Sequence, residues 1–145
     1  MTLLTILLNL CGVFAVVLGF LHFTFPEKFG FAAVMPKAGV PIPPFRLAFY
    51  RYEMKCSDLR GIIYVMNHCV SYVILSVGLF DLFAQRWFGT FPGSLAACLI
   101  GGFWLMRAAT QLYLGKRKGD WFVIAWFCLL GGLHFFAAFS HDVFE

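Results

Sequence analysis

The sequence predicts an all-α integral membrane protein, an antiparallel four-helix bundle with an amphipathic helix before its second span. Of the 145 residues, 61% are hydrophobic and only 12% are charged, whereas soluble chains carry roughly 25% charged residues. The apolar residues fall into four segments, each long enough to cross the hydrocarbon core of a bilayer. A chain of this length suits one transmembrane domain, residues 1–145.

The four spans are expected at about 3–25, 61–83, 94–114 and 121–139. Pro26 ends the first span because proline cannot continue a helix, and a Phe91-Pro92-Gly93 turn precedes the third. The first segment lacks the basic start and the small-residue exit of a signal peptide, so we expect it to remain as a helix. Aromatic residues gather at the span ends, as at membrane interfaces.

Lysine and arginine are distributed unevenly between the loops. The loop 26–60 holds six of them and the loop before the fourth span holds three, whereas the loop between the second and third spans holds only Arg86. The positive-inside rule therefore places both basic loops in the cytoplasm and both termini outside, in the periplasm if the membrane is a bacterial inner membrane. The positive charge thus reflects topology, and we expect no nucleic-acid partner.

The loop 26–60 is long for a bundle connection and has two halves of different character. Prolines interrupt the first half, so we expect it to be irregular. In the second half, Phe45, Phe49, Tyr52 and Cys56 recur at steps of three and four, which predicts an amphipathic helix over about 45–60. This helix either lies in the headgroup plane or continues into the second span, and the absence of a helix breaker before Gly61 favours the continuous form.

Arg107 is placed inside the third span, where an arginine is costly and marks a candidate site. Counting helical rise, His68 lies at the same depth, about 10 Å inside the cytoplasmic boundary. We therefore expect a ligand-binding layer on the cytoplasmic half, to which loop arginines also contribute; its candidate residues are Arg107, His68, Gln111, Asn67, His22, Arg46 and Arg51. The alternative is that Arg107 is a structural anchor whose side chain reaches back to the membrane surface.

On the outer half of the membrane, Asn9 and His134 share a depth of about 9 Å and are expected to bond to each other. Asp81 is near the outer end of the second span, and no acidic residue lies at mid-membrane. Proton pumping is therefore poorly supported.

The sequence contains no Ser/His/Asp set, no HExxH, no phosphate-binding loop and no CxxC, so we expect neither a catalytic nor a metal site. The leading hypothesis is an accessory or structural subunit of a larger inner-membrane complex, surrounded by lipid and partnered by other subunits or by copies of itself. A second hypothesis is binding of a quinone or an anionic lipid around Arg107 and His68. A third is a haem held by His68 and another histidine, which requires a tilted macrocycle.

Short motifs resemble a known group of proteins. Phe25-Pro26-Glu27 at the end of the first span, Arg46-Leu47-Ala48-Phe49-Tyr50 before the second, Arg107 in the third and the glycine turn at Gly119 are similar to DoxX-related four-helix bacterial membrane proteins, particularly their DUF4345-like branch. The group usually has glycines where this chain has Arg51-Tyr52-Glu53. The resemblance implies an antiparallel four-helix bundle, in some members an accessory partner of quinone-linked oxidoreductases, with Arg46 and Arg107 as the marked positions.

Overall fold

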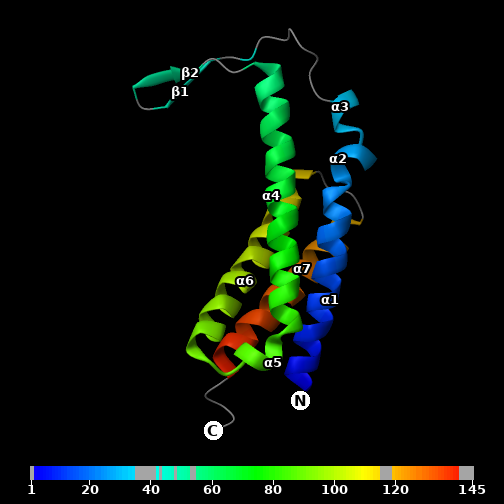
Figure 1. Cartoon of the computed structure of the whole chain (residues 1–145), viewed down its shortest axis with the longest axis vertical. Coiled ribbons are helices and arrows are strands. Elements are labelled where there is room, and N and C mark those ends of the chain that lie inside the picture. Colours follow the sequence, from blue (N-terminus) through cyan, green and yellow to red (C-terminus); the bar gives the residue numbers. More distant parts are fainter. Residues whose placement is uncertain are drawn as a thin grey trace. The chain divides into compact units, whose positions relative to one another are not determined.

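The computed structural model describes residues 2–34, 42, 44–47, 49–52, 55–114 and 119–140 (Figure 1). The chain divides into two compact units. Unit 1 comprises Met1–Phe14 and Val77–Glu145, and unit 2 comprises Ala15–Ser76. Helices α1 (Leu3–Phe23) and α4 (Cys56–Leu82) each contribute one part to each unit.

Within the residues that the structure describes, four helices are long and apolar enough to cross a membrane, which confirms the four predicted segments and is consistent with an integral membrane protein. They are α1, α4, α6 (Phe91–Thr110) and α7 (Asp120–Phe139). A 3₁₀ turn, η1 (Gln111–Leu114), continues α6. The second segment is longer than expected because its helix begins at Cys56, where the Asp58 carboxylate accepts a hydrogen bond from the Lys55 backbone N–H at 2.9 Å. An acidic side chain three residues into a helix commonly caps it in this way.

Short helices flank the spans. After α1 come α2 (Phe25–Lys28), with Pro26 in its first turn, and α3 (Phe31–Val34). After α4 comes α5 (Ala84–Trp87). The turn expected at residues 91–93 is instead the first turn of α6, where the Thr90 hydroxyl accepts a hydrogen bond from the Gly93 backbone N–H at 3.1 Å. Proline is favoured in a first turn because its missing N–H has no helical partner there.

The helix predicted over about 45–60 is wrong for its first half. The chain forms two short strands, β1 (Phe45–Leu47) and β2 (Tyr50–Tyr52), which pair antiparallel. Of the residues described in this range, only 56–60 are helical, as the start of α4. Apolar or aromatic residues alternate with Arg46 and Arg51 along the two strands, and this period of two, together with the aromatic content, favours strand. The segment before the strands, expected to be irregular, is helical in α2 and α3, so that expectation is wrong there. Residues 35–41 and 43 of this segment lie outside the described residues.

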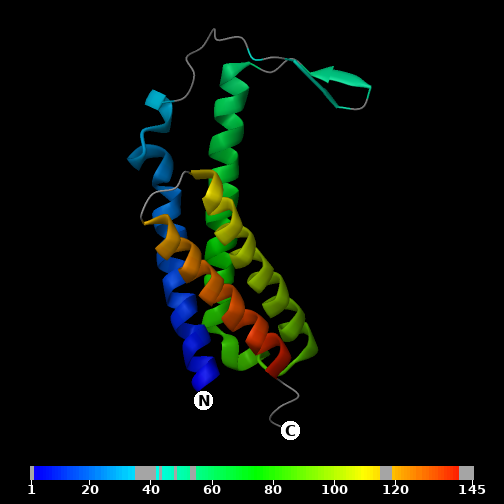
Figure 2. The same ribbon diagram turned by 180° about the vertical axis from the view of Figure 1, so that it is seen from behind.

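Unit 1 has its core where α1, α5, α6 and α7 meet, and the buried residues there are Leu8, Ala84, Trp87, Ala97, Ala137 and Ala138. Helices α6 and α7 run side by side, as Figures 1 and 2 both show. They approach closely at Gly101 and Gly131, where a Cβ on either glycine would lie 3.1 Å from the other's carbonyl oxygen. A side chain at either position would crowd the facing backbone, so the two glycines favour the close spacing of the pair.

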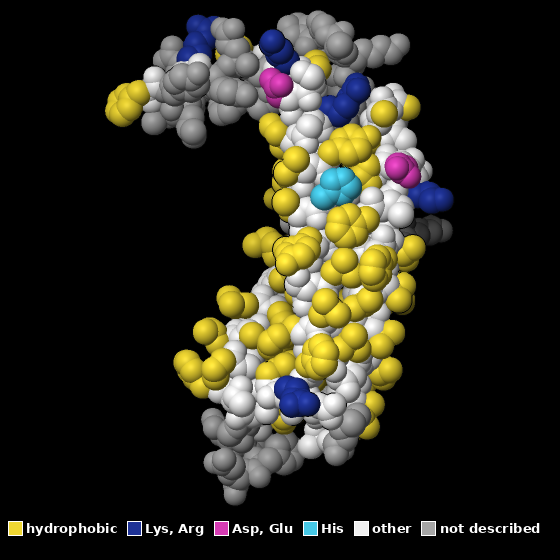
Figure 3. Space-filling view, in the orientation of Figure 1, with side chains coloured by type: hydrophobic (Ala, Val, Ile, Leu, Met, Phe, Trp, Pro, Cys, Tyr) yellow, Lys and Arg dark blue, Asp and Glu magenta, His cyan; other side chains and the backbone are white. Residues whose placement is uncertain are grey.

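Much of each span faces outward. Only 28% to 33% of the most apolar window of each helix is buried inside the protein. Figure 3 shows hydrophobic side chains over much of the helical surface on one face. Such a surface suits lipid or apolar protein neighbours, because large exposed apolar patches mark sites of interaction with proteins or membranes.

Candidate functional site: two polar clusters and an apolar groove

The most deeply buried polar contact in unit 1 joins Asp81, near the end of α4, to His134 of α7. Both side chains are fully buried. The Nε2 atom of His134 lies 3.1 and 3.0 Å from the two carboxylate oxygens of Asp81, and its Nδ1 lies 2.7 Å from the carbonyl oxygen of Leu130. Both ring nitrogens of His134 are therefore engaged.

This geometry determines the charge of the Asp81–His134 pair. A carbonyl oxygen only accepts hydrogen bonds, so Nδ1 of His134 carries a hydrogen. A proton must also lie between Nε2 and the carboxyl group of Asp81. The pair is then either an imidazolium with a carboxylate or a neutral imidazole with a carboxylic acid, and in both forms its net charge is zero. Neutrality is what permits two ionisable groups to be sealed in an apolar interior.

The prediction that Asn9 bonds to His134 is wrong. Both nitrogens of His134 have other partners, and the buried Oδ1 atom of Asn9 has no hydrogen-bond partner. The partner that sequence reasoning missed is Asp81. The sequence did contain a signal for this contact, since Asp81 and His134 are both near the outer ends of their spans. Counting helical rise, however, places them at depths that differ by about one turn. The packing of α4 against α7 brings the two side chains into contact despite this difference.

The second polar cluster of unit 1 contains the predicted Arg107 and Gln111. Nη1 of Arg107 donates to Oε1 of Gln111 at 2.8 Å, and Nε2 of Gln111 donates to Oδ1 of Asp120 at 2.8 Å. The guanidinium carbon also lies 5.1 Å from the centre of the Phe127 ring, within the range of a cation–π contact. The structure thus brings together two predicted residues and adds Asp120, to which no role was assigned.

The cluster joins the end of α6 to the start of α7. Arg107 is in the last turn of α6 and Asp120 is in the first turn of α7. A cation is stabilised at a helix C-terminus and an anion at a helix N-terminus, so both charges match the dipoles of their own helices. Because Gln111 links the two charges, the positive charge of Arg107 is partly balanced within the protein. This arrangement favours the alternative that Arg107 is a structural anchor over the hypothesis that it forms an open anion-binding site.

Three other predicted residues lie in unit 2. Nδ2 of Asn67 donates to the backbone carbonyl of His22 at 3.0 Å, so α4 and α1 are linked at this level. Nδ1 of His22 lies 3.0 Å from Oγ of Ser71, and the exposed His68 stacks on Phe23 with ring centres 5.6 Å apart. The structure thus brings Asn67 and His22 together, and places His68 against Phe23.

The full predicted layer has members in both units: Arg107 and Gln111 in unit 1, and the three residues of α1 and α4 in unit 2. Its assembly therefore stays a prediction. Of the loop arginines, Arg46 is in β1 and Arg51 is in β2, and the side chain of Arg51 is exposed. The haem hypothesis loses one ligand, because His134 has no unengaged ring nitrogen.

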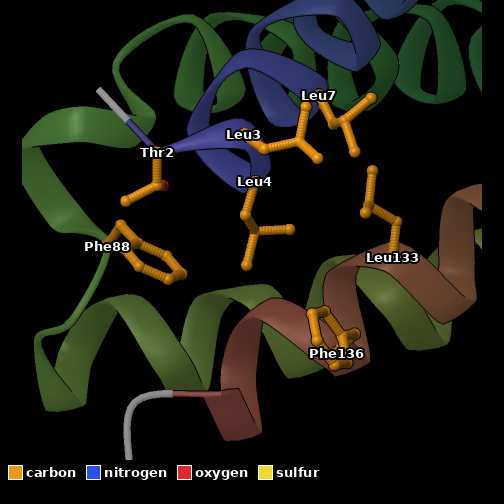
Figure 4. Close-up of a pocket in the computed structure, with 7 residues that line it drawn as sticks. All are labelled: Thr2, Leu3, Leu4, Leu7, Phe88, Leu133 and Phe136. Carbon is orange, nitrogen blue, oxygen red and sulfur yellow. The ribbon is translucent and has the colours of Figure 1, made fainter. Parts of the chain in front are cut away.

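Unit 1 also contains an apolar groove between α1 and α7, made of two adjoining pockets of about 440 and 450 Å³. Figure 4 shows the first, where Leu3, Leu4 and Leu7 of α1 face Leu133 and Phe136 of α7. The second continues along the same helices past Cys11 and Trp126. Leu7 and Leu133 line both pockets. Sequence reasoning missed this groove because it is formed only by the packing of two helices.

Comparisons of the chain with models of protein families, with curated proteins and with solved structures find no match. The resemblance to DoxX-related proteins therefore stays a prediction, and with it the marked roles of Arg46 and Arg107. Function is inferred from the residues and the geometry of this chain.

Proposed function

We propose that this chain is a non-catalytic accessory or structural subunit of a larger membrane complex. The supporting observation is the outward-facing apolar surface: no more than 33% of the most apolar window of any span is buried inside the protein. The polar groups of unit 1 support the same conclusion, because Asp81 with His134 and Arg107 with Gln111 and Asp120 join helices to one another. These contacts build a scaffold, and the remaining apolar surface is available to neighbours.

Site-specific photocrosslinking tests this proposal. A photoreactive phenylalanine analogue replaces Leu99 of α6 or Leu129 of α7, whose side chains are 69% and 62% exposed, and the matched control replaces Trp104, which is 1% exposed. The expected result is a discrete protein adduct from at least one exposed position and none from position 104. Isolation in mild detergent at a monomer-sized mass, with only lipid adducts, contradicts the proposal.

For this subunit we propose a bacterial inner-membrane location, with both basic loops in the cytoplasm and both termini in the periplasm. The support is the distribution of lysine and arginine between the loops. The test attaches a reporter that is active only in the periplasm to each terminus and, separately, within the loop 26–60. Activity at the termini and none in the loop is expected, and the reverse pattern overturns the orientation.

The second candidate function is binding of a lipid or a quinone, and the α1–α7 groove favours it. Each of its two pockets has the size of a typical small-molecule site. The walls are almost wholly apolar, so they suit the hydrocarbon tail of such a ligand better than its polar head. Binding around Arg107 and His68 is the other location that we propose for this function, with the polar head near Arg107.

Mass spectrometry of ligands retained in detergent tests the groove. Leu133 lines both pockets, so Leu133→Trp should fill the groove and release a specifically retained lipid or quinone. Leu99→Trp adds the same bulk at an exposed position of α6 and should leave retention unchanged. Equal retention by both variants contradicts binding in the groove. Loss in Arg107→Leu alone places the ligand at the Arg107 cluster instead.

A further inference from the structure

The hairpin β1–β2 separates its residues into two chemical classes by register. The Cα partners are Phe45 with Tyr52, Arg46 with Arg51, and Leu47 with Tyr50. Partnered residues of an antiparallel pair share a face of the ribbon, and successive residues alternate between faces. The two arginines therefore occupy one face, and the four apolar or aromatic positions occupy the other.

This hairpin is tethered to the start of α4, a helix long and apolar enough to span a membrane. Three residues separate Tyr52 from Cys56, the first residue of α4, so the hairpin ends within roughly 14 Å of that helix. Helix α4 has 27 residues and is about 40 Å long, which exceeds the hydrocarbon thickness of about 30 Å. If α4 spans the bilayer, its polar first turn, with Asp58 and Arg60, is at headgroup level. The hairpin is then held at the same level.

Three features make the hairpin unfavourable by itself. The register pairs position 46 with position 51, both arginines, and like charges at directly partnered positions are destabilising in a sheet. An isolated two-stranded hairpin is also only marginally stable in water. In addition, Phe49 in the turn between the strands is fully exposed. An anionic surface with an apolar layer beneath it relieves all three costs, since phosphate neutralises the arginines and the interface accepts aromatic side chains.

We infer that the β1–β2 hairpin is a recognition element for anionic phospholipid headgroups. The arginine positions bind the phosphodiester groups, and the aromatic positions with Phe49 enter the interface. Arginine suits this role because its guanidinium group forms paired hydrogen bonds with phosphate. The inference is independent of the accessory-subunit proposal, because it concerns the lipid around the chain and not a protein partner.

Hydrogen–deuterium exchange of the full chain in lipid nanodiscs tests the inference. Exchange of the amides of residues 45–52 is compared in phosphatidylcholine discs and in discs containing phosphatidylglycerol. A basic residue at an anionic surface contributes about fivefold in affinity, so two arginines should slow exchange by about 25-fold. The slowing should fall in high salt, because screening weakens surface electrostatics.

The variant Arg46→Gln/Arg51→Gln should lose the response to phosphatidylglycerol. The matched control Lys28→Gln/Arg86→Gln removes the same charge from two exposed positions outside the hairpin and should keep it. Equal exchange of the wild-type chain in both lipids overturns the inference, and this comparison requires no variant to fold. Protection that depends on a co-purified protein, or a response that both double variants lose equally, also overturns it.

Discussion

The two polar clusters of unit 1 perform the same task in different surroundings. The Asp81–His134 pair is fully sealed, whereas the chain from Arg107 through Gln111 to Asp120 is only partly buried. In the sealed pair neither partner can find a substitute for the other, so the loss of one leaves a buried polar group without a partner. Arg107 is in the last turn of α6 and its side chain can turn to the membrane surface. We therefore expect the sealed pair to be the more sensitive of the two.

This difference can be measured in unit 1 alone. All four tryptophans of the chain, Trp87, Trp104, Trp121 and Trp126, belong to unit 1. Tryptophan fluorescence during denaturation in mixed detergent micelles therefore follows the unfolding of this unit. Each prediction that follows refers to the free energy of unfolding obtained in this way.

Asp81→Leu should have the largest effect, a loss of about 3 kcal/mol, because it leaves the buried Nε2 of His134 without a partner. The double variant Asp81→Leu/His134→Leu should regain part of that loss, since replacing both members of a buried pair by apolar residues is often tolerated. A loss below about 1 kcal/mol in the single variant would show that the site can admit water.

Gln111→Leu should destabilise unit 1 by about 2 kcal/mol. The substitution removes the acceptor of Arg107 and the donor to Asp120 at once, and hydrogen bonds to charged groups are stronger than neutral ones. Gln111→Glu separates the two hydrogen bonds. It keeps the acceptor for Arg107 and places a negative charge against Asp120. If Gln111→Leu is neutral, Gln111 is not the link between α6 and α7.

Arg107→Leu should cost about 1 kcal/mol, less than Gln111→Leu, because the bond between Gln111 and Asp120 survives. Arg107→Lys keeps the positive charge but removes the planar set of N–H donors of the guanidinium group, so it tests the donors separately from the charge. If Arg107→Leu loses as much stability as Asp81→Leu, the Arg107 cluster is as sensitive as the Asp81–His134 pair, and the expected difference between the two clusters is wrong.

Asp81→Asn should have the smallest effect, about 0.5 kcal/mol. The asparagine amide can donate to Nε2 of a neutral His134, whose Nδ1 hydrogen still bonds to Leu130, so the site stays neutral and satisfied. The carboxyl stretching band assigned by difference infrared spectroscopy against this variant identifies the form of Asp81. A loss near 3 kcal/mol in Asp81→Asn would show that the pair needs the charges of an imidazolium and a carboxylate.

Much of the fold could be predicted from the sequence, with differences at the ends of elements. The four spans follow from runs of about 20 apolar residues, a local property that needs no tertiary contact. The hairpin was missed because Phe45, Phe49 and Tyr52 fit a helical period, while the alternation within residues 45–47 and within residues 50–52 fits a strand period. Short segments with both patterns are ambiguous, and here the pairing of two strands decides between them.

The candidate site was predicted less completely. The sequence by itself determined which residues are polar within the apolar segments and roughly how deep each one lies, because helical rise is constant. It identified Arg107 and Gln111 as neighbours one helical turn apart. Their link to Asp120, the choice of Asp81 over Asn9 as the partner of His134, and the groove between α1 and α7 were decided only by tertiary structure. Depth along a helix is a local quantity, whereas the direction in which a side chain meets another helix depends on how both helices rotate and pack.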